Sequence, residues 1–182
     1  MSANQYVALL RGINVGGNNQ VSMADLRAAF EAEGFDDVRT YINSGNVLFS
    51  ADSGRAGLED RVEEMLRRRL GIDLMVVVRS RRQLENIIRK APEGFGEHPD
   101  LYHSDVVFVK APLTPARALG VVELREEVDQ AWAGTGVLYF ARLSARRTQS
   151  KMSKIMGTPE YKLMTIRSWS TTTRLRDLWE KA

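Results

Sequence analysis

Apolar and polar residues alternate with two different periods along the first part of the chain. Short apolar runs predict four strands, at residues 6–10, 38–42, 47–50 and 74–78. Apolar residues at helical spacing predict two helices, one between Ser22 and Gly34 and one over residues 58–70. The run Asn43-Ser44-Gly45-Asn46 between the second and third strands is typical of a hairpin turn. The resulting order, β-α-β-β-α-β, is that of an alpha-beta plait of the ferredoxin-like type.

The second part of the chain shows a less regular pattern. Ser80 and Gln83 fit a capping box, and the helix after them is predicted to end near Pro92. Further strands and helices are predicted, with strands at residues 106–109, 128–132 and 137–141 and helices beginning at Thr114-Pro115 and at Ser170. Part of segment 145–159 is expected to be a short helix, and the pattern of residues 161–166 is ambiguous. We therefore expect an α+β fold of two alpha-beta plait (ferredoxin-like) subdomains, residues 1–79 and residues 80–182.

Composition is that of an ordinary soluble globular protein. Of the 182 residues, 43% are hydrophobic, which is enough to build a packed core. The first residues lack the charged and apolar regions of a secretory signal, and the longest purely apolar runs have the length of strands. The absence of cysteine excludes disulfides, a thiolate nucleophile and cysteine-ligated zinc or iron–sulfur sites. These features predict a cytoplasmic protein with no membrane partner.

The net charge of +3 is unevenly distributed along the chain. From Arg142 to the end, ten Lys or Arg residues stand against three Asp or Glu residues, a balance of +7. The preceding residues carry 16 basic against 20 acidic side chains, a balance of −4. A polyanion would therefore be steered toward the C-terminal segment. The alternative is a solvated basic surface without a ligand.

A loop rich in glycine and asparagine follows the first predicted strand. Both residue types tolerate positive φ angles, and asparagine adds a side-chain amide. In a plait, the end of the first strand and the turn at residues 43–46 lie at the same edge of the sheet, so residues 12–19 should adjoin that turn. The candidate ligand-binding residues at this edge are Arg11, Asn14, Asn18, Asn19, Tyr41, Asn43 and Ser44. The alternative is that they only form turns, since neither a GxGxxG nor a Walker motif is present.

A second candidate site lies in the basic C-terminal segment. The start of the last predicted helix offers backbone N–H groups that attract anions, and Thr171 lies in its first turn. Arg167 lies just upstream, and Lys151 would reach the same anion if the chain folds back between them. The alternative is that Arg167 pairs with a carboxylate and that Ser170 merely caps the helix. RNA recognition by an RRM-type sheet is not expected, because the third strand lacks the required signature.

The two histidines lie in a polar segment with metal-capable side chains, Glu97, His98, Asp100, His103 and Asp105. Their spacing matches no helix-borne ligand pair such as HExxH, so we expect a polar surface loop and no metal site. Ser44 lies outside any GxSxG motif and no histidine is near it in the predicted plait, so a catalytic triad is not expected. The acidic pairs are typical of solvated faces or element ends: Asp36-Asp37, Glu59-Asp60, Glu63-Glu64 and Glu126-Glu127.

Several of these residues together resemble a known bacterial family. The matching motifs are Arg11-Gly12-Ile13-Asn14-Val15-Gly16 with Asp25-Leu26, Thr40-Tyr41 through Ser44-Gly45-Asn46, Ser150-Lys151, and the set Thr165, Arg167, Trp169, Thr171 and Leu175. On these residues the chain resembles, over nearly its whole length, the family catalogued as domain of unknown function 1697. Where that family usually reads Arg-Asn-Trp-Asn-Thr, this chain has Ser168 and Ser170 in place of the two asparagines. The resemblance implies a pair of alpha-beta plait subdomains and no established activity.

These observations lead to the hypothesis of a protein that binds an anionic, phosphate-bearing ligand. A phosphorylated metabolite, a nucleotide and a nucleic acid backbone all fit. Two alternatives remain open, a small-molecule enzyme with its site at the Gly/Asn loop edge and a non-catalytic scaffold that forms a homodimer. Neither a cofactor nor a catalytic residue can be named from the sequence. A steep loss of affinity with salt would distinguish nucleic acid from a small ligand.

Overall fold

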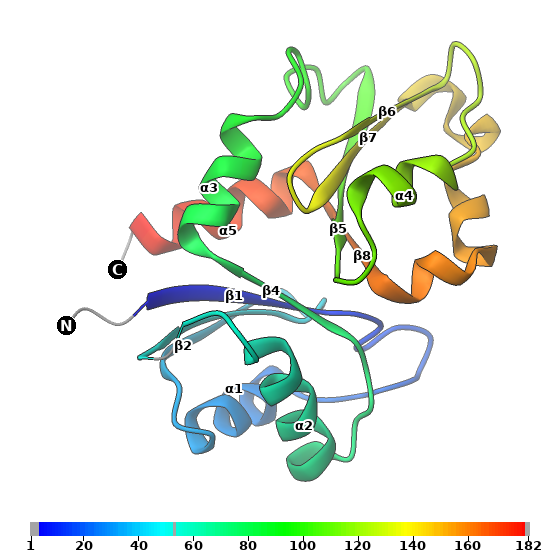
Figure 1. Ribbon diagram of the computed structural model, residues 1–182. Coiled ribbons are helices and arrows are strands. Elements are labelled where there is room, and N and C mark those ends of the chain that lie inside the picture. The colour runs from blue at the N-terminus through cyan, green and yellow to red at the C-terminus, as the bar shows by residue number, and fades with distance from the viewer. Residues whose placement is uncertain (1–3, 53, 181–182) are drawn as a thin grey trace. The chain divides into compact units, whose positions relative to one another are not determined.

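The structure is a computed structural model that describes residues 4–52 and 54–180 (Figure 1). The chain divides into two compact units, residues 1–84 and 85–182, and the division falls inside helix α3 (Arg81–Arg89). Each unit contains one four-stranded antiparallel sheet together with helices. The predicted α+β fold of two alpha-beta plait-like halves is therefore confirmed.

The first unit has the element order that the apolar pattern predicts. Its elements are β1 (Asn4–Leu10), α1 (Met23–Ala32), β2 (Asp36–Tyr41), β3 (Asn46–Ala51), α2 (Leu58–Leu70) and β4 (Val76–Ser80). The strand order is β2-β3-β1-β4, so β1 and β3 are the central strands and β4 is an edge. Both helices lie on the same face of this sheet (Figure 1).

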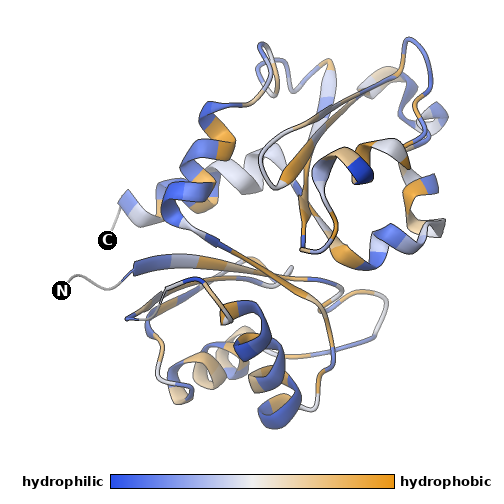
Figure 2. Cartoon of the chain, viewed as in Figure 1, coloured by the Kyte–Doolittle hydropathy of each residue, from blue (hydrophilic) through white to orange (hydrophobic). Residues whose placement is uncertain are grey.

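An aromatic cluster fills the space between that face and the two helices. The rings of Phe30, Phe35 and Phe49 lie 4.7 to 5.7 Å apart in tilted pairs. Tilted pairs are favoured over a face-to-face sandwich because the positive edge of one ring approaches the negative face of another. Figure 2 shows the corresponding hydropathy, with orange along much of the central strands and blue over much of α2.

Two glutamates of α2 cover the outer edge of β4. The carboxylate of Glu63 accepts a hydrogen bond from the backbone N–H of Val76 at 2.8 Å, and that of Glu59 accepts one from Val78 at 3.0 Å. Without such bonds, an edge strand exposes unpaired N–H groups that can pair with a strand of another protein chain. The expectation of a solvated face is therefore wrong for Glu63, because its carboxylate bonds the backbone of β4. Glu59 lies at the end of an element, as one of the two expectations held, and it bonds the same strand.

The second unit repeats the strand order of the first. Its elements are the greater part of α3, then β5 (Tyr102–Val109), α4 (Pro115–Gly120), β6 (Asp129–Ala133), β7 (Val137–Leu143), the short 3₁₀ helices η1 (Ser144–Gln149), η2 (Met152–Gly157) and η3 (Pro159–Leu163), β8 (Met164–Ser168) and α5 (Trp169–Glu180). The order β6-β7-β5-β8 matches that of the first unit, with three 3₁₀ turns where the first unit has α2. The ambiguous stretch 161–166 therefore divides between η3 and β8.

Both faces of the second sheet are covered. On one face, Val107 and Phe140 pack with Ala118 of α4 and Ile155 of η2. The opposite face carries Tyr139, whose hydroxyl donates a 2.6 Å hydrogen bond to the Ile87 carbonyl of α3. Burial raises the pKa of Tyr139 to about 12, since loss of water disfavours the phenolate.

Trp169 at the start of α5 belongs to an aromatic cluster in this unit. Its ring meets Phe95 edge to face at 5.1 Å, and Phe95 also meets Tyr139 at 5.3 Å. Gly96 follows Phe95 with φ +77, and a Cβ atom there would lie 2.1 Å from the Trp169 ring. The Trp169 ring therefore has a packing role in the second unit.

Candidate functional site

The Gly/Asn loop and the β2–β3 turn lie side by side at one end of the first sheet. Leu10 N–H donates to the Gly45 carbonyl at 2.8 Å, and the Asn14 side-chain amide donates to the Asn43 carbonyl at 3.3 Å. Gly45 has φ +75, and a Cβ atom there would lie 2.5 Å from Ile13. The predicted adjacency of residues 12–19 and 43–46 is thus confirmed, and Gly45 is required by the close approach.

The asparagine amides of this edge bind mainly to the loop itself. Asn14 accepts from the N–H of Val21 at 2.8 Å and donates to its carbonyl at 3.0 Å, while the Asn19 amide donates to the Gly12 carbonyl at 3.2 Å. Both asparagines have positive φ angles, 53° and 49°. The alternative that these residues only form turns therefore explains why Asn14 and Asn19 occur in this loop. The other predicted residues of this edge are half-buried (Arg11, Tyr41, Ser44) or exposed (Asn18, Asn43).

The predicted residues of the basic segment lie in different surroundings. The Lys151 ammonium is 3.7 Å from the Glu123 carboxylate, which Lys154 also contacts. Arg167 is buried and donates to the Thr165 hydroxyl at 3.0 Å and to the Ile166 carbonyl at 2.9 Å. Desolvation lowers the pKa of Arg167 to about 10. Lys151 therefore pairs with a carboxylate, whereas Arg167 bonds a hydroxyl and a backbone carbonyl, so the two predicted ligand-binding cations have different partners.

The second sheet carries a polar cluster at one end that the sequence did not reveal. The Asp105 carboxylate of β5 is contacted by His103 Nε2 at 3.2 Å and by Arg142 Nη2 of β7 at 3.5 Å. Asp105 is buried, whereas the side chains of His103 and Arg142 keep 40% and 21% of their surface exposed. The carboxylate thus sits below the surface and two cationic or proton-binding groups lie above it.

The start of α5 adjoins this cluster. Asp105 and Ser168 are directly paired residues of β5 and β8, so their side chains lie on the same face of the sheet. Ser168 is the N-cap of α5, because its hydroxyl accepts from Thr171 N–H at 3.2 Å. The same hydroxyl lies 3.0 Å from those of Thr171 and Ser170. The helix therefore begins one residue earlier than predicted, and Ser168 takes the capping role assigned to Ser170.

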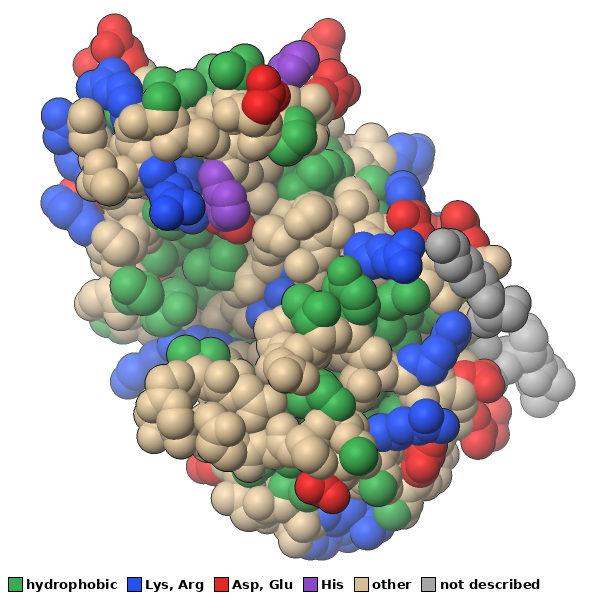
Figure 3. Space-filling model, turned by 180° about the vertical axis from the view of Figure 1, so that it is seen from behind, with side chains coloured by type: hydrophobic (Ala, Val, Ile, Leu, Met, Phe, Trp, Pro, Cys, Tyr) green, Lys and Arg blue, Asp and Glu red, His purple; other side chains and the backbone are tan. Residues whose placement is uncertain are grey.

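We name the set His103, Asp105, Arg142, Ser168 and Thr171 the β5–α5 cluster. Burial raises the pKa of the Asp105 carboxyl, and the charges of His103 and Arg142 offset part of that rise. The Nε atom of Arg142 is buried and has no hydrogen-bond partner among residues 4–52 and 54–180. A guanidinium donor without an acceptor is costly inside a protein unless a ligand or water supplies one. Figure 3 shows both histidines at the surface, one of them directly beside a Lys or Arg side chain.

The sequence pattern does not bring these residues together. It predicts a polar surface loop around His103 and Asp105, but β5 begins at Tyr102, so the two residues occupy alternate positions on one strand face. That alternation was visible in the sequence, whereas the pairing with Arg142 depends on the register of β5 and β7. In the part of the chain that the structure describes, no three His, Asp or Glu side chains are grouped closely enough to hold a metal ion.

Comparison with known proteins gives the family. The model of the family described as "Protein of unknown function (DUF1697)" matches residues 3–139. The chain belongs to this family. A search of curated proteins found no match. A solved structure, that of the conserved bacterial protein SP0830 from Streptococcus pneumoniae, is similar to this chain with 24% sequence identity and a TM-score of 0.86, and the match covers 97% of this chain and 99% of that one.

The DUF1697 match and the neighbour establish family and fold. At 24% identity, the likeness to the pneumococcal protein concerns the fold alone. No helix within residues 4–52 and 54–180 has both the length and the apolar character needed to cross a membrane.

Proposed function

We propose that this DUF1697 protein binds a phosphate-bearing ligand at the β5–α5 cluster. The observation that carries the proposal is the guanidinium of Arg142, which Asp105 holds in place and whose buried Nε lacks a described acceptor. Guanidinium groups match phosphate oxygens in shape and charge and bind them in a bidentate manner. A phosphorylated metabolite, a nucleotide and a nucleic acid backbone share this chemistry.

The start of α5 strengthens the site as a place for negative charge. Helix N-termini carry a partial positive charge of roughly half a unit, and α5 has 12 residues. Hydroxyl groups of Thr171 and Ser170 stand in its first turn and suit phosphate oxygens. Asp105 opposes an anion by its own charge, but it contacts both Arg142 and His103. The Arg142 guanidinium offsets the negative charge of Asp105, and the start of α5 adds the attraction for an anion.

The test is a titration of the full chain with inorganic phosphate. Binding is monitored through the backbone amide NMR signals of Ser170 and Thr171. Arg142→Gln should weaken binding by about tenfold or more, because it removes a hydrogen bond between two charged groups. Arg147→Gln is the matched control, since Arg147 is exposed and its substitution makes the same change in net charge. Equal loss in both variants, or no saturable shift in the wild-type protein, would contradict the proposal.

A second titration identifies the size of the ligand. A single-stranded oligonucleotide that spans several phosphates should lose affinity steeply as salt rises, whereas inorganic phosphate should show a shallow dependence. For the oligonucleotide, Arg142→Gln should reduce the slope of log affinity against log salt by about one unit. An oligonucleotide that binds with a slope unchanged by Arg142→Gln contacts another surface, and the β5–α5 cluster then serves a small ligand.

A further inference from the structure

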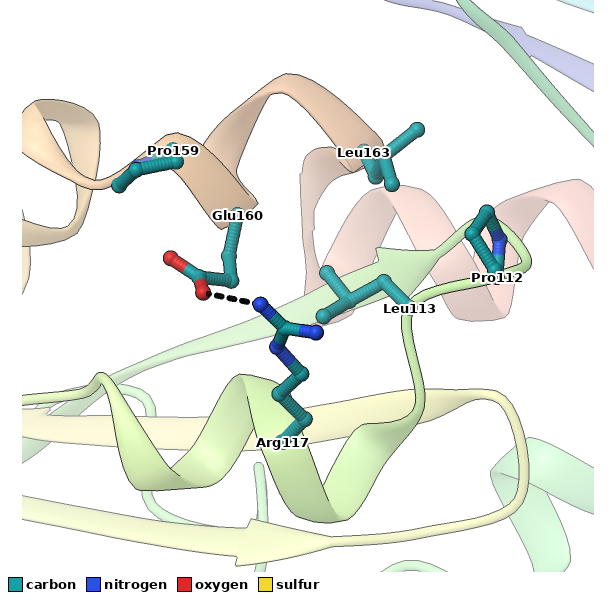
Figure 4. A pocket seen from close by; sticks show the side chains of 6 residues that line it. All are labelled: Pro112, Leu113, Arg117, Pro159, Glu160 and Leu163. Carbon is teal, nitrogen blue, oxygen red and sulfur yellow. Dashed lines mark hydrogen bonds and ion pairs between the residues drawn. The ribbon is translucent and has the colours of Figure 1, made fainter.

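A small pocket in the second unit lies between the β5–α4 connection, α4 and η3 (Figure 4). Its volume is about 190 Å³, and its lining residues are Pro112, Leu113, Arg117, Pro159, Glu160 and Leu163. Four of these side chains are apolar. The other two form an ion pair, in which Arg117 Nη2 donates to Glu160 Oε1 at 3.2 Å. The pocket shares no residue with the β5–α5 cluster.

The two charged side chains of the pocket differ in solvent exposure. The Arg117 side chain is 71% exposed, so water surrounds most of it, whereas Glu160 is 13% exposed. In the described part of the chain, Arg117 is the hydrogen-bond partner of the Glu160 carboxylate, through one of its two oxygens. An ion pair with one exposed partner contributes little, about 0 to 1 kcal/mol. A ligand could therefore separate the two groups at small cost.

We infer that this pocket binds an aliphatic α-amino acid in its zwitterionic form. The ligand's ammonium would meet Glu160, its carboxylate would meet Arg117, and its side chain would contact Leu113 and Leu163. Both ends of the ligand are then paired, and the apolar part is removed from water. Figure 4 shows Arg117 reaching from α4 toward Glu160 on η3, with Leu113 close to the guanidinium.

Size and charge together select this ligand class. The volume of about 190 Å³ is below the roughly 300–1,000 Å³ of sites for drug-sized ligands, and a dry cavity of about 150 Å³ holds one benzene molecule. A molecule of leucine size is therefore appropriate. A simple carboxylic acid would place its charge beside Glu160 without a cation of its own, and a simple amine would compete with Arg117. Only a ligand with both charges satisfies the two side chains at once.

The experiment is a titration of the full chain with L-leucine. Binding is monitored through the methyl NMR signals of Leu113 and Leu163. Binding should saturate with a dissociation constant in the millimolar range or tighter. N-acetyl-L-leucine lacks the ammonium and L-leucinamide lacks the carboxylate, so each should bind at least about tenfold more weakly than leucine. Glycine should also bind more weakly, because it makes no contact with the apolar wall.

Variants locate the site. Glu160→Gln and Arg117→Gln should each weaken leucine binding by about tenfold or more. Glu123→Gln is the matched control, because Glu123 also forms an ion pair in this unit, with Lys154 at 2.7 Å, and does not line the pocket. The absence of methyl shifts at about 10 mM leucine, or equal binding of leucine and its two analogues, would overturn the inference. The analogue series uses the unaltered protein, so a variant that folds poorly does not leave the question open.

Discussion

Asn14 and Asn43 are 29 positions apart in the chain, and the side-chain amide of the first donates a 3.3 Å hydrogen bond to the backbone carbonyl of the second. The same Asn14 side chain also accepts from and donates to the backbone of Val21. One residue therefore closes the Gly/Asn loop and fastens it to the β2–β3 turn. The glycines and asparagines of this loop suggest a ligand site, but the Asn14 side chain stabilises the loop and its contact with the β2–β3 turn.

Asn14→Ala should lower the free energy of unfolding by about 1–3 kcal/mol, because it leaves the partly buried Val21 N–H without an acceptor and removes two donated bonds. Asn18→Ala is the control, since the Asn18 side chain is exposed, and should change stability by less than about 0.5 kcal/mol. Urea unfolding of the three proteins measures both effects. Unchanged stability of Asn14→Ala would restore a ligand-binding role for this amide.

The first sheet was predictable because local pattern and topology agree there. Residues 6–10 are all buried, as an unbroken apolar run indicates, and the turn at residues 43–46 joins β2 to β3 as expected. The second unit was harder to predict. The segment expected to contain one short helix forms the 3₁₀ helices η1 and η2, in which basic residues interrupt the few apolar ones. The strand β8 buries Arg167, a residue type that seldom lies inside a protein.

The β5–α5 cluster could not be assembled from sequence because it depends on two long-range strand pairings, that of β5 with β7 and that of β5 with β8. Arg142 lies opposite His103, and Ser168 lies opposite Asp105, only in the observed register of β5 with β7 and β8. A shift of one residue would turn each side chain to the other face. Thr171 alone among these residues was predicted in a site, because a helix start is recognisable locally.

Gly96→Ala should destabilise the second unit strongly. The alanine Cβ would lie 2.1 Å from the Trp169 ring, and the residue would also hold an unfavourable φ of +77. Gly94→Ala is a close control, because Gly94 has φ +76 and no atom within 4 Å of the added Cβ. We expect a loss of about 1–2 kcal/mol for Gly94→Ala from backbone strain alone. The loss for Gly96→Ala should be larger, with a changed tryptophan fluorescence in the folded state.

Removing the carboxylate that covers the β4 edge should weaken the first unit. Glu63→Ala leaves the partly buried Val76 N–H without this acceptor, so the free energy of unfolding should fall by about 1–3 kcal/mol. Glu64→Ala is the neighbouring control, because the Glu64 side chain is 61% exposed and pairs only with the exposed Arg67 in the described structure. Thermal unfolding measures the difference. Equal midpoints for the two variants would show that the edge bond contributes nothing to stability.

The buried carboxyl of Asp105 makes stability depend on pH in a defined direction. Burial raises its pKa above the ordinary value of 3.8, so the folded protein keeps this proton at a pH where the unfolded chain has lost it. The unfolded state then binds fewer protons, and the free energy of unfolding falls as pH rises. This contribution is fully present below the unfolded pKa and is lost as pH rises through the folded pKa.

Asp105→Asn should remove that fall. The free energy of unfolding of the variant, minus that of the wild-type protein, should therefore increase as pH rises from about 4 and then level off above the folded pKa. Asp100→Asn is the control, because it makes the same change at an exposed carboxyl of the preceding loop. Denaturant unfolding at a series of pH values measures both curves. If the difference in the free energy of unfolding decreases with pH for Asp105→Asn, the prediction is wrong. His103 and Arg142 would then stabilise the carboxylate of Asp105 by more than burial destabilises it.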